Sequence, residues 1–284
     1  MNANSASSFS KPLFSVAILD MYNGEPNQGM RCILDILTRF SGLVQYEIFD
    51  VRKEAKLPKI SSFDLYISTG GPGNPMEGDG TWDVAYYQFI DQLSLWNRQQ
   101  PIKKYVLFIC HSFQMACLHF GLAQVTKRQS TSFGVMSIHK VETGHTDPLF
   151  QGLNNPFWGI DSREYQVVQP DHAIFKNKGA QIISLEKIRT HVEYERAIMG
   201  VRFTPEMVGL QFHPEADPIS FIANLRDAEK RNRIIAMKGK KRFRDMLEDL
   251  CDDNKIYKTN ETIIPNFIRQ SINQLMEQRK MEVN

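Results

Sequence analysis

The stretch YVLFICHSFQMA (residues 105–116) decides how this chain folds and where its chemistry lies. Its first five residues are apolar or aromatic, which is typical of a strand buried in a parallel sheet. The run ends abruptly at Cys110, and a segment of helical character follows at once. A strand that turns sharply into a helix lifts the side chain of the turn residue above the edge of the sheet. The pattern therefore predicts a cysteine presented at the mouth of a helix.

This position makes Cys110 a candidate nucleophile. The first turn of a helix carries unpaired N–H groups and a partial positive charge, which favour the thiolate. Ligands of open α/β sheets bind at the carboxyl ends of parallel strands, where this residue stands. The alternative is that Cys110 is a small buried apolar residue, as most lone cysteines are.

Further strands and helices alternate along the chain and predict an α/β fold with a mainly parallel sheet flanked by helices. Between about residues 130 and 211 the pattern changes to short strands separated by turns, which predicts a small antiparallel extension of the sheet. The expected strands are 13–19, 46–51, 64–68, 104–109 and 207–212, and the expected helices are 30–40 and 81–98, with another after ADPIS (216–220).

Composition and length narrow the possible functions. The chain has 284 residues, 42% hydrophobic content and a formal net charge of +2, which predicts a globular protein without a nucleic-acid or membrane partner. Its Ser-rich start lacks the apolar core of a secretion signal, and there is no apolar run of 18 residues. The four cysteines form no CxxC pair, which argues against a disulfide framework or a metal site. We expect a cytoplasmic protein.

We expect three parts in the chain: a flexible arm (1–12), the α/β domain (13–224) and a helical C-terminal extension (225–284). The extension contains a charged helical stretch at 226–250 and an amphipathic helix at 263–280. We interpret the basic residues of the charged stretch as solvated helix faces. The alternative is a docking surface for an acidic partner.

The stretch VGLQFHPEAD (208–217) supplies a candidate base and its orienting group. His213 follows an apolar strand, and Glu215 lies two residues later, with Pro214 fixing the backbone between them. This spacing lets the carboxylate contact one imidazole nitrogen while the other nitrogen faces a thiol. A histidine alone is more often a structural residue with its hydrogen bonds satisfied, and Glu215 alone is consistent with a surface carboxylate or a charge at a helix start.

A glycine-rich turn, STGGPGNP (68–75), follows the strand at 64–68. Such a turn exposes backbone N–H groups that bind either a phosphate or the oxyanion of a tetrahedral intermediate. The stretch lacks the GK[ST] ending of a P-loop, so nucleotide phosphate is the weaker interpretation.

Taken together, STGGPGNP, ICHSFQ (109–114) and GLQFHPE (209–215) resemble the class I glutamine amidotransferases. The similarity is strongest to stand-alone proteins that resemble the glutaminase part of GMP synthase, and it covers about residues 14–222. It implies a flavodoxin-like glutamine amidotransferase fold and no cofactor. It also implies a catalytic triad of Cys110, His213 and Glu215, an oxyanion hole made by the backbone N–H groups of Gly71 and His111, and glutamine contacts from Gly73 and Gln114.

The chain departs from the family pattern in two places. Phe108 and Ser112 stand where the family usually has glycines around the cysteine, which predicts a reshaped turn. The segment DSREYQV (161–167) replaces a short His-Gly-type loop that holds the amino-acid end of the substrate. Arg163 and Glu164 are the substrate-binding candidates there, and the alternative is that they pair with each other on the surface. We interpret His111 as a residue that lines the pocket rather than as a second base.

The resemblance implies a glutaminase-type amidohydrolase or amidotransferase that releases ammonia through a γ-glutamyl thioester. One alternative keeps the triad but hydrolyses another γ-glutamyl compound or transfers an acyl group. The other is a catalytically inactive binding subunit. The implied partners are glutamine or a related amide, a separate ammonia-accepting synthetase or other acceptor, and a second copy of the chain in a homodimer.

Overall fold

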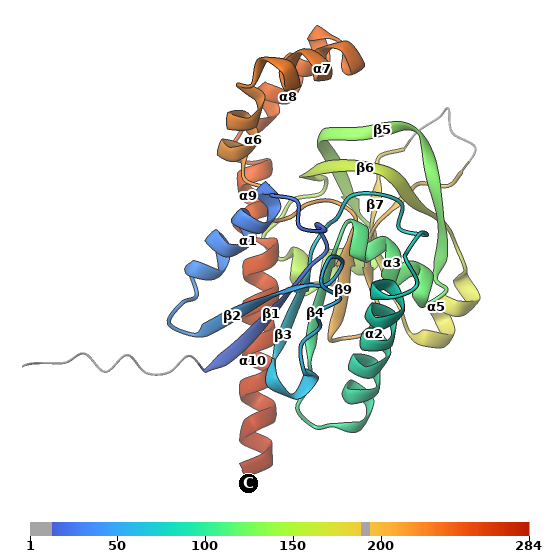
Figure 1. Ribbon diagram of the computed structural model, residues 1–284, viewed down its shortest axis with the longest axis vertical. Coiled ribbons are helices and arrows are strands. Elements are labelled where there is room, and N and C mark those ends of the chain that lie inside the picture. The colour runs from blue at the N-terminus through green and yellow to red at the C-terminus, as the bar shows by residue number, and fades with distance from the viewer. Residues whose placement is uncertain (1–12, 189–193, 284) are drawn as a thin grey trace, which may run out of the picture.

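The computed structural model describes residues 13–188 and 194–283, so the predicted arm at 1–12 lies outside the described residues (Figure 1). In this part of the chain the strands form one nine-stranded sheet of order β2-β1-β3-β4-β9-β8-β7-β5-β6. The first five strands in this order are parallel, as the sequence predicts. They are β2 (Val44–Asp50), β1 (Phe14–Asp20), β3 (Leu65–Ser68), β4 (Tyr105–Ile109) and β9 (Met207–Leu210).

The other half of the sheet is antiparallel, which confirms the predicted extension. Its strands are β8 (Ile198–Arg202), β7 (Gln181–Glu186), β5 (Ala123–Lys140) and β6 (Phe157–Pro170). Two of these are long rather than short, because β5 has 18 residues and β6 has 14. They form a hairpin that arches beyond the carboxyl ends of the parallel strands (Figure 1). Only residues 138–140 of β5 pair with β7.

Helices cover both faces of the parallel strands. Strand alternation sends Leu107 of β4 to one face and Phe108 to the other. The first face carries α1 (Gln28–Thr38) and α10 (Ile263–Val283), and the second carries α2 (Trp82–Gln99) and α3 (His111–His119). The remaining helical elements are η1 (Ile60–Ser62), α4 (Glu142–Thr146), η2 (Pro148–Phe150), α5 (His172–Lys178), α6 (Pro218–Leu225), α7 (Ala228–Lys238), α8 (Lys240–Leu250) and α9 (Ile256–Asn260).

The amphipathic helix α10 is a core element of the α/β fold. It runs along the sheet in Figure 1, and its apolar side chains share one buried cluster with strands β1, β3 and β4. Polar contacts fix its last turns, because Gln278 Nε2 donates to Tyr105 Oη (3.0 Å) and Arg279 pairs with Asp64 (2.6 Å). Its buried apolar residues are Ile263, Ile264, Phe267, Ile268, Ile272 and Leu275.

Helices α6, α7, α8 and α9 pack against the β5–β6 hairpin instead. A smaller apolar cluster joins Ile160 of β6 to Met246 and Leu250 of α8. Asp217 starts α6 by accepting a hydrogen bond from the Ser220 backbone N–H, with proline at the first helical position. Among the described residues, no helix is both long and apolar enough to cross a membrane.

Candidate active site

Cys110 is the turn residue between β4 and α3, with φ +49° and ψ −99°. A residue other than glycine is strained at positive φ by about 1–3 kcal/mol, so the surrounding structure must hold it there. The Cys110 backbone N–H donates to the Leu210 carbonyl of β9 (2.8 Å), and its carbonyl accepts from the Gln114 N–H (3.0 Å). The side chain is therefore held at the carboxyl ends of the parallel strands.

The turn at Cys110 accommodates Phe108 and Ser112, which are larger than glycine. Phe108 lies opposite Gly209 of β9. A Cβ atom at Gly209 would lie 2.6 Å from the Phe113 ring, 2.9 Å from the Phe203 ring and 3.3 Å from Phe108 Cβ, so this glycine makes room for three phenylalanine side chains. Ser112 Oγ accepts from the Ile109 backbone N–H (2.9 Å) and donates to the Ser68 carbonyl (2.8 Å). This hydroxyl joins the start of α3 to the end of β3.

His213 and Glu215 meet beside Cys110. His213 Nδ1 lies 2.7 Å from Glu215 Oε1, and the Glu215 side chain is only 1% exposed. The His213 backbone N–H donates to the Ile160 carbonyl of β6 (2.8 Å), which fixes the histidine beneath the hairpin. A Cβ atom at Gly70 would lie 2.8 Å from His213 Cε1 and 3.5 Å from Cys110 Cβ. Gly70 is thus needed for the close approach of ring and thiol.

The charges around His213 favour the imidazolium. Burial opposes the charged ring, but the Glu215 carboxylate and the Cys110 sulfur together outweigh burial and raise the pKa of His213 well above its ordinary value. Because Glu215 occupies Nδ1, the Nε2 atom is left for the thiol. The arrangement can therefore take a proton from a thiol and return it to a leaving group.

Asn260, from helix α9, supports the loop that carries Glu215 and is a residue that sequence reasoning missed. Its Nδ2 atom donates to the Glu215 backbone carbonyl at 2.7 Å, and the residue is only 6% exposed. Nothing in the local sequence signals this contact, because 45 residues separate the two partners.

We expect Asn260→Asp to slow alkylation of Cys110 by iodoacetamide about fivefold, because a buried carbonyl without its donor costs about 1–3 kcal/mol and the Glu215 loop can shift. The aspartate keeps the shape of the side chain but cannot donate when ionised. Asn266→Asp is the matched control, because Asn266 donates to the Gln151 carbonyl (3.0 Å). Equal alkylation rates in the two variants, measured by mass spectrometry, would contradict a positioning role.

The glycine-rich turn lies beside Cys110, and its glycines Gly71 and Gly73 differ in what they face. A Cβ atom at Gly71 would overlap the Met21 carbonyl oxygen at the end of β1, so its close neighbour is backbone. Arg52, which sequence reasoning missed, fastens this turn by donating to the Pro72 carbonyl (2.6 Å) and to the Met21 carbonyl (3.3 Å). Gly73 has φ +88° and is exposed, so only its backbone is available to a ligand.

His111 is buried at the first position of α3, and its Nε2 atom has no hydrogen-bond partner among the described residues. Burial, helped by the positive charge of Arg52, lowers the pKa of His111 to about 3. The ring is therefore neutral near pH 7 and binds a proton only weakly. Within the described chain, the backbone N–H groups of His111 and Gly71 have no acceptor.

The neutral His111 predicts a pH-dependent stability. In the unfolded chain His111 binds a proton near pH 6.5, and in the folded chain it does so only near pH 3. The contribution of neutral His111 to the free energy of unfolding is therefore complete above pH 6.5 and falls as the pH drops toward 3. At pH 5 the loss from this residue is about 2 kcal/mol. We expect His111→Phe to flatten the pH dependence of the free energy of unfolding in urea between pH 7 and 5. The exposed control, His172→Gln, should leave it unchanged.

Gln114 faces the protein interior. Its Nε2 atom donates to the Tyr165 carbonyl (3.2 Å) and to Gln211 Oε1 (3.1 Å). Gln211 in turn directs its Nε2 atom at Cys110 Sγ (3.8 Å) and is fully buried. The amide nitrogen of Gln114 is therefore engaged within the fold, and Gln211 is a further residue near the thiol that sequence reasoning missed.

The structure does not bring Arg163 and Glu164 together, and the alternative that they pair with each other on the surface is wrong. Arg163 is 4% exposed and bonds Asp161 (2.9 Å) and Glu186 (3.4 Å). Glu164 is exposed, since neighbouring residues of a strand point to opposite faces. The backbone of this segment still covers the site, because the Ser162 carbonyl lies 3.9 Å from Cys110 Sγ.

The fold is that of a known class of proteins. The family model described as "Glutamine amidotransferase class-I" matches residues 33–225, which is more than half of the chain. The chain therefore belongs to the class-I glutamine amidotransferase family, as its motifs predict. Among curated proteins, no sequence matches the chain.

Solved structures share the fold at low sequence identity. A glutamine amidotransferase from Thermotoga maritima has a TM-score of 0.65 at 17% identity, covering 92% of this chain and 99% of that one. A glutamine amidotransferase from Methylobacillus flagellatus has a TM-score of 0.60 at 15% identity, covering 95% of this chain and 96% of that one. The glutaminase domain of the Trypanosoma brucei CTPS, solved with bound acivicin, has a TM-score of 0.52 at 14% identity, covering 71% of this chain and 86% of that one.

Proposed function

We propose that the chain hydrolyses the side-chain amide of glutamine through a thioester on Cys110. The observation that carries this proposal is the pairing of buried Glu215 with His213 Nδ1 (2.7 Å) next to a cysteine held at positive φ. Family membership makes glutamine the first substrate to test. Ammonia would then pass to a separate acceptor protein or leave directly.

The residues account for each step of the reaction. His213 takes the thiol proton, and Cys110 Sγ attacks the amide carbon to give a tetrahedral oxyanion, with the N–H groups of Gly71 and His111 as its donors. The carbon–nitrogen bond breaks as His213 returns the proton to the departing ammonia. Water then gives a proton to His213 and attacks the thioester, which releases glutamate and restores the thiol.

An observation also favours a second candidate, which is hydrolysis or transfer of another γ-glutamyl or acyl group. Arg163 is held in buried ion pairs with Asp161 and Glu186, and Glu164 is exposed, so the two do not form a joint site for the amino-acid end of glutamine next to the thiol. The same triad acts on any activated acyl carbon. The electrophile that labels Cys110 therefore distinguishes the two candidates.

The test compares acivicin with iodoacetamide as labels for Cys110, read by mass spectrometry. Acivicin is the ligand of the trypanosomal glutaminase domain named above. Labelling by acivicin that L-glutamine prevents, together with ammonia release from L-glutamine, supports the glutaminase. Labelling by iodoacetamide alone favours the second candidate if a γ-glutamyl or acyl ester is turned over. If no such ester is turned over either, the inactive binding subunit remains.

A further inference from the structure

A groove of about 440 Å³ lies between β5 and helices α7 and α8, outside the candidate active site. This volume is within the range of about 300–1,000 Å³ that small-molecule sites occupy. Its walls come from two parts of the chain, the β5–β6 hairpin and the helices that follow the family match. Its apolar lining includes Phe133, Val135, Trp158, Ile234, Phe243 and Met246.

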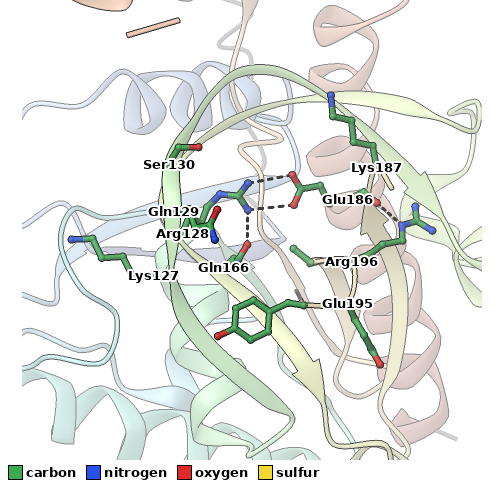
Figure 2. Close-up of a pocket in the computed structure, with 11 residues that line it drawn as sticks. Lys127, Arg128, Gln129, Ser130, Gln166, Glu186, Lys187, Glu195 and Arg196 are labelled. Carbon is green, nitrogen blue, oxygen red and sulfur yellow. Dashed lines mark hydrogen bonds and ion pairs between the residues drawn. The ribbon is translucent and has the colours of Figure 1, made fainter. Parts of the chain in front are cut away.

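The rim of this β5–α8 groove is positively charged. Its acidic residues are already paired, Asp245 with Lys241 (2.9 Å) and Asp249 with Lys255 (2.5 Å). Lys187 and Arg242 are exposed and have no ionic partner among the described residues. In Figure 2, Lys187 points away from the ion pair between Arg128 and Glu186. Two cations at the rim are therefore left for a ligand.

A buried polar group also lines the groove. Ser132 of β5 is 4% exposed, and its Oγ atom has no hydrogen-bond partner in the described part of the chain. A buried hydroxyl without a partner is unfavourable, so native proteins usually satisfy such groups. Because this oxygen is inaccessible to solvent, a ligand in the groove reaches it only when the β5 wall of the groove shifts.

We propose that the β5–α8 groove binds a small organic anion that carries an aromatic or branched apolar group. The apolar part lies against Phe133 and Phe243, and the anionic group pairs with Lys187 and Arg242 at the rim. Apolar walls with a few convergent polar groups are the usual composition of such sites. This site is additional to the proposed glutamine chemistry.

The groove is also close to the nucleophile in the fold. Phe133 pairs with Ser162 across the hairpin, and the Ser162 carbonyl lies 3.9 Å from Cys110 Sγ. A ligand in the groove therefore contacts the strand pair that covers the thiol. Binding is measured without turnover, so a failure of the glutaminase proposal would leave this test unaffected.

The test uses 8-anilinonaphthalene-1-sulfonate, an aromatic anion, and its uncharged analogue N-phenyl-1-naphthylamine as fluorescent probes of the full chain. We expect one sulfonate probe per chain. The double variant Lys187→Gln/Arg242→Gln should weaken sulfonate binding about tenfold or more, because two charge-assisted contacts are lost. Its affinity for the neutral probe should stay the same. Lys127→Gln is the matched control, since Lys127 is exposed on β5 but does not line the groove.

Filling the groove with a larger side chain should abolish the binding of both probes. Val135→Phe and Ser137→Phe each place a ring into it from β5, and thermal melting identifies the variant that stays folded. The proposal is overturned if both folded variants bind the sulfonate like the wild type. Several probes per chain, or an equal loss of affinity in Lys127→Gln, would overturn it as well.

Discussion

Replacing Cys110 with alanine is expected to reduce ammonia release from glutamine to below about one thousandth, with the free energy of unfolding nearly unchanged. Activity is lost because the attacking sulfur is gone. Stability is kept because alanine has the same Cβ atom and is strained to the same extent at φ +49°. Cys110→Gly should instead stabilise the fold by about 1 kcal/mol, since glycine is not strained there.

Removing the base should cost as much as removing the nucleophile. We expect His213→Ala to lower the rate nearly as far as Cys110→Ala, and the double variant to be scarcely worse than either, because the two act as one unit. Glu215→Gln should be milder, since His213 remains in place. Cys117→Ala is the control for cysteine content, as Cys117 is fully buried on α3. Additive losses across Cys110 and His213, measured by single-turnover kinetics, would contradict a shared site.

The sequence predicted the parts of this site that depend on local signals. An apolar run that stops at Cys110 identifies the end of β4, and the one before His213 identifies the end of β9. Parallel strands bring such ends to one edge, so the two residues meet without any knowledge of the loops. The parallel and antiparallel halves of the sheet follow from the same alternation of strands and helices.

Contacts between distant segments could not be predicted in this way. Asn260 and Gln211 reach the Glu215 loop and Cys110 through the packing of whole elements, which no short motif encodes. The error over Arg163 and Glu164 is different, because a signal was present. Both lie in β6, and the twofold alternation of a strand separates neighbouring side chains onto opposite faces.

The sequence also placed α10 in a separate extension starting at residue 225. In the structure α10 packs against the sheet, so the question is whether the chain folds without this helix. A chain that ends after Thr262 loses six buried apolar side chains, including Phe267 and Ile268, from the face of the sheet. At about 1.5–3 kcal/mol each, the loss is on the order of 10 kcal/mol, comparable to the whole stability of a typical domain of about 5–15 kcal/mol. We therefore expect the truncated chain to be unfolded or insoluble.

Two controls separate the loss of this core from the loss of chain length. A chain that ends after Lys280 removes Met281, which is 72% exposed, and should melt like the full chain. Within α10, Phe267→Ala should cost about 3–5 kcal/mol, whereas Glu277→Ala on its exposed side should change stability little. Cooperative melting of the chain that ends after Thr262, at the temperature of the full chain, would show that residues 263–284 are a dispensable extension. In that case the contacts of α10 with β1, β3 and β4 would not contribute to the core.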